Sequence, residues 1–201
     1  MDVPKLIAAQ RARFEAGGTR DIAPRRQALQ NLQASIRQHE QLLCDALRAD
    51  LGKSAVESYM TEIGIVLGEI RFVLRNLKRW MRPRRVRTPF FAQPARSRIC
   101  YEPLGVVLIV APWNYPVQLL LNPLVGAISA GCTALLKPSP YTPNVAEVLE
   151  RMIAEIFDEE YVAVAQGGRE VNTLLFGMRW DVIFFTGSPA LGRIVMTAAA
   201  R

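Results

Sequence analysis

Residues 105–116 read GVVLIVAPWNYP, an apolar and largely β-branched run followed by a loop that contains two prolines. A short apolar run bounded by turn-forming residues is typical of a strand buried on both faces of a sheet. Pro112 and Pro116 restrict the backbone of the loop, and a tryptophan, an asparagine and a tyrosine lie between them. Loops at the ends of rigid strands commonly carry function, so we expect this one to hold its side chains for a purpose.

Three further apolar runs follow along the chain: TALLK at 133–137, YVAVA at 161–165 and DVIFFT at 181–186. The stretches between them have helical patterns, as in NVAEVLERMIAEIF at 144–157. Continuously apolar strands that alternate with helices require a parallel sheet covered on both faces. The sequence therefore predicts an α/β fold with a Rossmann-type doubly wound parallel sheet.

Residues 103–136 carry no charged side chain, which raises the alternative of a membrane-spanning segment. Prolines and asparagines interrupt this stretch so often that no apolar run of about 18 residues survives. We therefore interpret it as a buried strand and helix of an α/β core.

The first eighty residues have apolar side chains at helical spacing in a polar background. Asp21 is expected to begin a helix and Gly52 to end one. These patterns predict a helical segment with a basic linker over residues 1–98, followed by a dinucleotide-binding α/β portion over 99–201. The stretch RICYE at 98–102 is expected to form a short strand.

The chain carries 25 Lys and Arg against 18 Asp and Glu, a net charge of +7, and the basic residues are densest in RNLKRWMRPRRVR at 75–87. Such a patch could bind nucleic acid or a membrane surface, or it could be a solvated linker after a helix. It lacks interleaved stacking aromatics and any recognisable nucleic-acid-binding motif, which favours the linker.

The three cysteines, Cys44, Cys100 and Cys132, are too scattered for a disulfide framework or a zinc site, which fits a reducing cytoplasm. The N-terminus has charges throughout and no apolar core, so it does not resemble a secretory signal. The single histidine, His39, lies among polar residues and is expected to be exposed, which leaves little for a histidine relay or a metal site.

Polar loops follow all four expected strands: APWNYP, KPSPYTP, QGGRE and TGSPALG. In an open parallel sheet these loops meet at one rim, where ligands bind outside the carboxyl ends of the strands. Each loop leads into a helix whose first N–H groups suit a phosphate. No GxGxxG or P-loop motif is present, and GAISAG at 126–131 lies inside a helical pattern, so we interpret it as helix packing.

Together these motifs resemble the aldehyde dehydrogenase superfamily. EPLGVVLIVAPWNYP (102–116), ISAGCTALLKPS (128–139) and DVIFFTGSPALG (181–192) follow its N-terminal half in order and at suitable spacing. The resemblance extends from about residue 20 onward. The short N-terminus and the tyrosine after Asn114 are most similar to the class 3, dimeric branch of fatty and aromatic aldehyde dehydrogenases.

The resemblance implies a reaction in which a cysteine thiolate adds to an aldehyde, hydride passes to a nicotinamide, and a glutamate activates water to release the acid. Asn114 matches the family asparagine whose amide donates to the resulting oxyanion, and an amide donates without titrating near neutral pH. The alternative is that Asn114 caps the following helix, a role that asparagine favours.

The resemblance also implies an NAD or NADP site. Lys137 matches the lysine that reaches the adenosine ribose, although a lysine at a strand end can also point into water. Gly187, Ser188 and Gly192 match the loop and helix start that receive the pyrophosphate, and the same TGSPALG stretch is also a plain turn with an N-cap. The full set of expected cofactor-binding residues is Pro112, Trp113, Lys137, Ser139, Gly187, Ser188 and Gly192.

Position 140 departs from the family pattern, because it is proline where much of the family has a glutamate that accepts hydrogen bonds from the ribose hydroxyls. A proline side chain accepts no hydrogen bond and does not repel a 2′-phosphate. Tolerance of NADP is therefore a hypothesis.

The family's general-base glutamate, in an LELGG-like strand, and its nucleophilic cysteine would follow beyond residue 201, so the fold is expected to be incomplete relative to the family. Apolar surroundings are expected to keep Cys132 inert. We expect this chain alone to oxidise no aldehyde, and its sheet to end in an unpaired edge. The alternative is a non-catalytic nucleotide-binding or subunit-interaction module. The family also implies an aldehyde substrate and a homodimeric complete enzyme.

Overall fold

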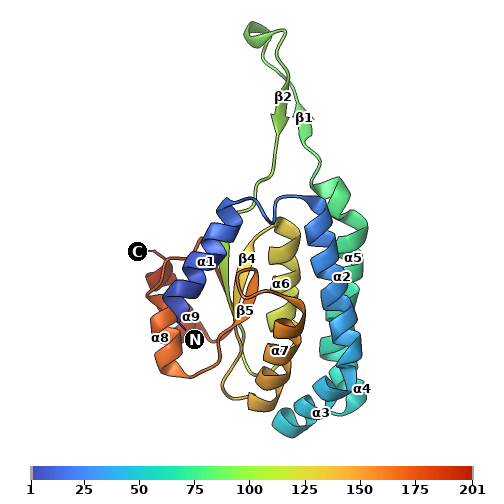
Figure 1. Cartoon of the computed structure of the whole chain (residues 1–201), viewed down its shortest axis with the longest axis vertical. Coiled ribbons are helices and arrows are strands. Elements are labelled where there is room, and N and C mark those ends of the chain that lie inside the picture. The colour runs from blue at the N-terminus through green and yellow to red at the C-terminus, as the bar shows by residue number, and fades with distance from the viewer. Residues whose placement is uncertain (1, 201) are drawn as a thin grey trace.

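A four-stranded parallel sheet forms the centre of the molecule, in a computed structural model that describes residues 2–200 (Figure 1). Its strand order is β5-β4-β3-β6. The strands are β3 (Val106–Val110), β4 (Thr133–Lys137), β5 (Val162–Val164) and β6 (Val182–Phe185). Each corresponds to one of the four apolar runs, so the predicted parallel sheet is confirmed, and β6 lies at one edge of it.

Side chains of the central strand alternate between two separate apolar clusters. Val107 and Ile109 of β3 join one cluster, while Leu108 and Val110 join the other. The pleat of a strand sends successive side chains to opposite faces, so a strand that is apolar at every position needs a cover on both.

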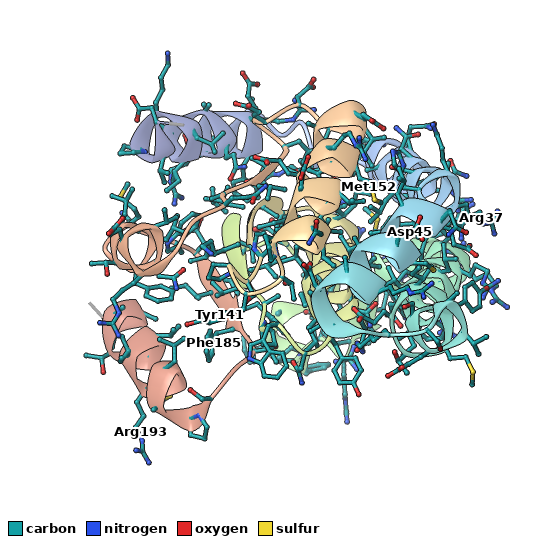
Figure 2. All side chains as sticks on the ribbon, turned by 90° about the horizontal axis from the view of Figure 1, so that it is seen from below. Arg37, Asp45, Tyr141, Met152, Phe185 and Arg193 are labelled. Carbon is teal, nitrogen blue, oxygen red and sulfur yellow. The ribbon has the colours of Figure 1, made fainter. Side chains whose placement is uncertain are left out.

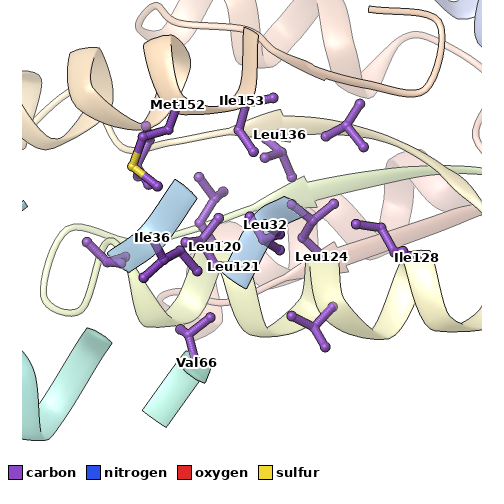
Figure 3. Close-up of a cluster of buried hydrophobic side chains, with 14 of the residues drawn as sticks. Leu32, Ile36, Val66, Leu120, Leu121, Leu124, Ile128, Leu136, Met152 and Ile153 are labelled. Atoms are coloured by element: carbon purple, nitrogen blue, oxygen red, sulfur yellow. The ribbon is translucent and has the colours of Figure 1, made fainter. Parts of the chain in front are cut away.

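The larger cluster lies between the sheet and two layers of helices. Figure 1 shows α6 and α7 beside the sheet with α2 and α5 outside them, and Figure 3 shows apolar side chains from these layers meeting. The helical elements on this side are α2 (Ile22–Gln38), α3 (Glu40–Leu51), α4 (Ala55–Ser58), the π-helix η1 (Tyr59–Ile63), α5 (Gly64–Trp80), α6 (Gln118–Ala130) and α7 (Pro143–Ile156). Residues on both sides of position 98 share this cluster, and the division of the chain there stays a prediction.

Three helices belong to the opposite side: α1 (Val3–Glu15), α8 (Arg169–Phe176) and α9 (Pro189–Ala199). The buried amide of Gln10 in α1 donates to the carbonyl of Ala134 in β4 at 3.0 Å. Arg11 pairs with Asp181 at 2.9 Å, at the start of the edge strand. Helices on both faces confirm the doubly wound arrangement.

The local signals for helix ends behave as the sequence predicts. Asp21 occupies the N-cap position of α2, although its side chain makes no capping hydrogen bond. Gly52 ends α3 with a φ of 69°, a left-handed conformation that costs glycine little.

The basic stretch at 75–87 runs from the last turns of α5, which ends at Trp80, into the first strand of a hairpin. Residues 84–99 form an antiparallel hairpin of β1 (Arg84–Val86) and β2 (Ser97–Ile99) that projects from the body of the molecule (Figure 1). The short 3-10 helix η2 (Phe90–Ala92) is at its tip, with Phe90 93% and Phe91 89% exposed. The expected strand at 98–102 therefore begins one residue earlier and ends at Ile99.

The expectation of an exposed His39 is wrong, because only 6% of the residue is accessible. The imidazole lies between the end of α2 and helix α7: Nδ1 is 2.9 Å from the carbonyl oxygen of Ser35 and Nε2 is 3.3 Å from the carboxylate of Glu155. The polar neighbours in the sequence gave no sign of α7, which comes from a hundred residues further along the chain.

No group of three or more His, Cys, Asp or Glu side chains within residues 2–200 is placed to hold a metal ion. No helix in this part of the chain is long and apolar enough to cross a membrane.

Candidate functional site

A cavity of about 720 Å³ opens at the carboxyl end of the sheet. The loops after β3, β4 and β6 line it together with one side of α8, as expected for an open parallel sheet. Figure 2 views the molecule from this end, and Tyr141 and Phe185, which both line the cavity, are labelled.

Most of the residues expected from the sequence lie on this cavity. They are Pro112, Trp113, Lys137, Ser139, Gly187 and Ser188. Asn114 and Gly192 are not among its lining residues. The sequence reasoning missed the contributions of α8, from Arg169, Asn172 and Thr173, and the ring of Phe185. The QGGRE stretch at 166–170, which leads into α8, could have indicated this contribution.

Lys137 is buried rather than solvated, with 1% of the residue accessible. It ends β4 opposite Val110 of β3, and its ammonium donates to the carbonyl of Pro138 at 2.7 Å. Burial lowers the pKa of Lys137 from 10.5 to about 8, because desolvation disfavours the charged form. The alternative of a lysine pointing into water is wrong for this structure.

Gly187 and Ser188 form the tight turn between β6 and α9. A Cβ atom on Gly187 would lie 2.5 Å from Cζ of Phe185, so this position has no room for a side chain unless the ring moves. The hydroxyl of Ser188 accepts a hydrogen bond from the N–H of Leu191 at 3.4 Å and caps α9. The turn with an N-cap is therefore present, and it also lines the cavity.

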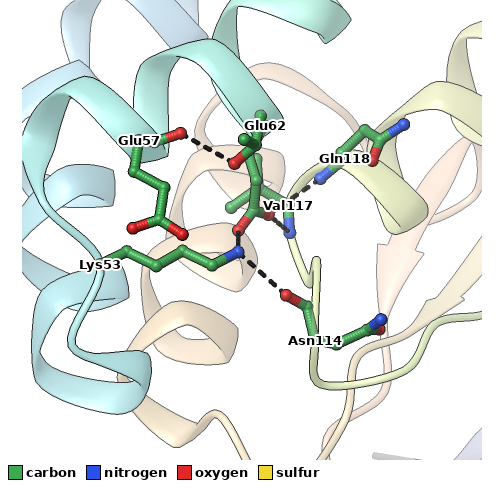
Figure 4. Close-up of polar contacts among 7 residues, drawn as sticks. Lys53, Glu57, Glu62, Asn114, Val117 and Gln118 are labelled. Atoms are coloured by element: carbon green, nitrogen blue, oxygen red, sulfur yellow. Dashed lines mark hydrogen bonds and ion pairs between the residues drawn. The ribbon is translucent and has the colours of Figure 1, made fainter.

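Asn114 is exposed on the loop after β3, and its side chain does not cap α6. The N–H groups of Val117 and Gln118 donate instead to one carboxylate oxygen of Glu62, at 2.8 and 3.3 Å (Figure 4). The capping alternative for Asn114 is thus contradicted, because Glu62 satisfies the first amides of that helix.

Glu62 in turn pairs with Lys53, which the sequence reasoning did not single out. The Lys53 ammonium lies 2.6 Å from the Glu62 carboxylate, donates to the carbonyl of Asn114 at 2.9 Å, and stands 4.2 Å from the ring centre of Tyr115 (Figure 4). The sequence did indicate that Glu62 is buried, because Glu62 precedes Val66 and Ile70 at helical spacing and so lies on the same side of the helix as these two residues.

None of the three cysteines lines the cavity. Cys44 and Cys132 are buried, and Cys100 is exposed near the base of the hairpin. Burial, followed by the nearby carboxylates of Glu40 and Asp45, raises the pKa of the Cys44 thiol. A thiol held neutral in this way is a poor nucleophile.

Comparison with protein-family models matches residues 1–201 to the aldehyde dehydrogenase family. The chain belongs to that family. Aldehyde dehydrogenase family 3 member B1 of Homo sapiens is 46% identical over 191 residues, 95% of this chain and 41% of that protein. This aldehyde dehydrogenase chain therefore resembles an N-terminal portion of the class 3 branch, as predicted.

Two solved structures share the fold. The substrate-bound state of Staphylococcus aureus AldH has a TM-score of 0.97 and 44% identity, and covers 100% of this chain and 44% of that one. Betaine aldehyde dehydrogenase from the same species, in complex with NAD+, has a TM-score of 0.85 at 26% identity and covers 99% of this chain and 40% of its own. This aldehyde dehydrogenase chain thus spans less than half of the proteins that it matches.

Proposed function

We propose that this chain is the cofactor-binding N-terminal part of an NAD(P)-dependent aldehyde dehydrogenase, which oxidises an aldehyde to a carboxylic acid. The observation that carries the proposal is the cavity at the carboxyl end of the sheet, where Lys137, Gly187 and Ser188 come together. Betaine aldehyde dehydrogenase, a structural relative, was solved with NAD+.

The residues around the cavity fit a dinucleotide. Trp113, Phe176 and Phe185 offer apolar walls for flat rings, while the ammonium of Lys137 and the hydroxyl of Ser188 offer donors. The first N–H groups of α9 start beside the turn at Gly187 and suit a pyrophosphate. When bound, the nicotinamide supplies the acceptor for hydride.

The role we propose for Asn114 is to donate its side-chain amide to the oxyanion. That amide makes none of the side-chain hydrogen bonds found in residues 2–200, so it is available, and the backbone of the same residue is held by Lys53. Removal of one such donor typically lowers kcat about a hundred- to a thousandfold. Because Asn114 lies outside the cavity lining, the oxyanion would form at the margin of the dinucleotide site.

We further propose that the chain by itself does not oxidise aldehydes. Its three cysteines lie away from the cavity, and the family's general-base glutamate has no counterpart in the motifs present. A nucleotide-binding or subunit-interaction role without catalysis is the alternative, and the alternative also predicts no turnover. The two differ in whether a complete polypeptide that continues past residue 201 oxidises aldehydes.

Nucleotide binding is tested by titrating the purified chain with NAD+ and NADP+ while tryptophan fluorescence is followed. Trp113 lines the cavity, so a saturable change is expected, and the variant Trp113→Phe should lose most of it. Trp80→Phe is the matched control, because Trp80 lies at the end of α5 away from this cavity. Absence of binding of either nucleotide by calorimetry would contradict the proposal.

We also infer a cytoplasmic location and a homodimeric complete enzyme without affinity for nucleic acid. Three free cysteines suit a reducing compartment, and the projecting hairpin with its exposed Phe90 and Phe91 suits contact with a second subunit. Sedimentation of a complete enzyme tests the dimer. Salt-dependent retention of duplex DNA by residues 75–87 would contradict the inferred lack of affinity for nucleic acid.

A further inference from the structure

Two side chains from the helical segment hold the backbone of the loop after β3. The ammonium of Lys53 donates to the backbone carbonyl of Asn114 at 2.9 Å, and the carboxylate of Glu62 accepts from the N–H of Val117 at 2.8 Å (Figure 4). These two side chains precede the groups that they bind by 61 and 55 positions in the chain. The loop is therefore held from outside itself, at one point on each side of Tyr115.

The Lys53–Glu62 pair is itself fixed in place. Lys53 is 8% and Glu62 0% exposed, and their charged groups lie 2.6 Å apart. The Lys53 ammonium also lies 4.2 Å from the ring centre of Tyr115, a cation–π contact to the residue that follows Asn114. Because the carboxylate, the carbonyl and the ring all contact the ammonium, its position is determined, and so is that of the Asn114 carbonyl.

The side-chain amide of Asn114 has no support of its own. Asn114 is exposed, and its amide takes part in none of the side-chain hydrogen bonds within residues 2–200. The position of the amide therefore depends on the backbone from which it projects. A donor to an oxyanion acts at about 2.7–3.1 Å. A displacement of about 1 Å, even one that is caused far from the chemistry, can lower a rate about a hundredfold.

We propose that Lys53 and Glu62 are positioning residues, which hold the backbone of Asn114 so that its side-chain amide reaches the oxyanion. This inference rests on the role proposed above for Asn114. Neither member of the pair lines the cavity, so the pair should contribute to kcat and not to the binding of aldehyde or nucleotide.

The first test uses this chain without any substrate. The backbone order parameter of Asn114, from NMR relaxation, should be about 0.85 in the wild type and below about 0.6 in Lys53→Met. Arg11→Met is the matched control, because it removes a cation from the partly buried pair with Asp181 and should leave that order parameter unchanged. If Asn114 is as ordered in Lys53→Met as in the wild type, the inference fails and the proposed function is unaffected.

The second test measures aldehyde oxidation by a complete polypeptide that continues past residue 201. Lys53→Met should lower kcat about a hundredfold and leave the KM values for aldehyde and nucleotide within about twofold. Lys53→Arg keeps a cation with N–H donors and should recover most of that loss. Lys53→Met combined with Asn114→Ala should be no slower than Asn114→Ala alone, because the pair acts only through Asn114. Arg11→Met should oxidise aldehyde at the rate of the wild type.

The double variant Lys53→Met with Glu62→Met separates positioning from stability. It leaves no carboxylate without a cation, so it should unfold at a higher urea concentration than Lys53→Met, while its kcat should remain as low. A kcat that recovers together with stability, or fully additive effects of Lys53→Met and Asn114→Ala, would overturn the inference and leave the proposed function standing. If the complete polypeptide oxidises no aldehyde, the proposed function fails and takes this inference with it.

Discussion

The ammonium of Lys53 lies 2.6 Å from the carboxylate of Glu62, in an ion pair that is buried between the helical segment and the loop after β3. Through this pair, the π-helix η1 holds the start of α6 and the carbonyl of Asn114 at once. A buried pair whose remaining donors and acceptors also find partners is costly to break on one side only, because one charge is then left without compensation.

The variant Lys53→Met leaves Glu62 buried without its cation. We expect a loss of about 3–5 kcal/mol in the free energy of unfolding in urea, and faster hydrogen exchange at the amides of Val117 and Gln118. Asp158→Asn is the control, since it breaks the surface pair with Arg13 and should cost less than about 1 kcal/mol. Equal losses of unfolding free energy in the two variants would show that the buried Lys53 pair contributes no more to stability than the surface pair.

The centre of the sheet is predicted to be the most sensitive part of the core. Leu108 is fully buried in β3 between neighbouring strands, so Leu108→Ala should lower the free energy of unfolding by about 2–5 kcal/mol. Leu104→Ala makes the same change at a residue that is 69% exposed and should cost under about 0.5 kcal/mol. Denaturant titrations of both variants test this contrast, and a small loss for Leu108→Ala would speak against the observed packing of the sheet.

The turn at Gly187 is predicted to be intolerant of a side chain. Gly187→Ala places a methyl group against Phe185, so either the ring, which lines the cavity, or the turn must shift, and we expect nucleotide affinity to fall about tenfold or more, the scale of one lost hydrogen bond to a charged group. Gly126→Ala is the control, because nothing lies within 4 Å of its added Cβ in α6. It should leave affinity unchanged and raise the free energy of unfolding by about 0.5–1 kcal/mol. If Gly187→Ala bound the nucleotide as tightly as the wild type, the turn at Gly187 would not be part of the nucleotide-binding site.

Lys137 is predicted to make stability depend on pH. Its pKa is about 8 in the folded chain and 10.5 when unperturbed, so between these values the unfolded state binds more protons, and the free energy of unfolding rises with pH. Lys137→Met removes this contribution, so its stability advantage over the wild type should be largest below pH 8 and shrink toward pH 10.5. Urea unfolding across this range provides the measurement.

Lys78→Met is the control for that series, since Lys78 is exposed at the end of α5. Its pH profile should follow that of the wild type. A constant difference between Lys137→Met and the wild type at every pH would contradict the lowered pKa of Lys137.

The four strands were predictable because each is a nearly continuous apolar run, a pattern typical of a strand covered on both faces. The loops of the rim were predictable for the same reason, since parallel strands deliver their carboxyl ends to one edge. Of the hairpin at 84–99 only the second strand was predicted, because the two strands pair with each other but have no buried face, and hence no apolar alternation marks the first.

The parts of the site that escaped prediction depend on long-range contacts. Glu62 precedes Val117 by 55 residues, and no local pattern shows that a helix start needs that carboxylate. The sequence could place Lys137 at the carboxyl end of a strand, but it could not predict that the side chain is buried. Its burial depends on residues of other loops that cover it. His39 was misjudged for the same reason, since α7 covers it.

The shared apolar cluster has a consequence for synthesis on the ribosome. The buried faces of α2 and α5 belong to one apolar cluster with those of α6 and α7, and these two later helices end at Ala130 and Ile156. Translation at about 5–20 residues per second leaves roughly 4–15 s between the emergence of α5 and that of α7. Until α6 and then α7 emerge, the nascent helices can pair only with one another, so the first eighty residues complete their folding only when both later helices have arrived.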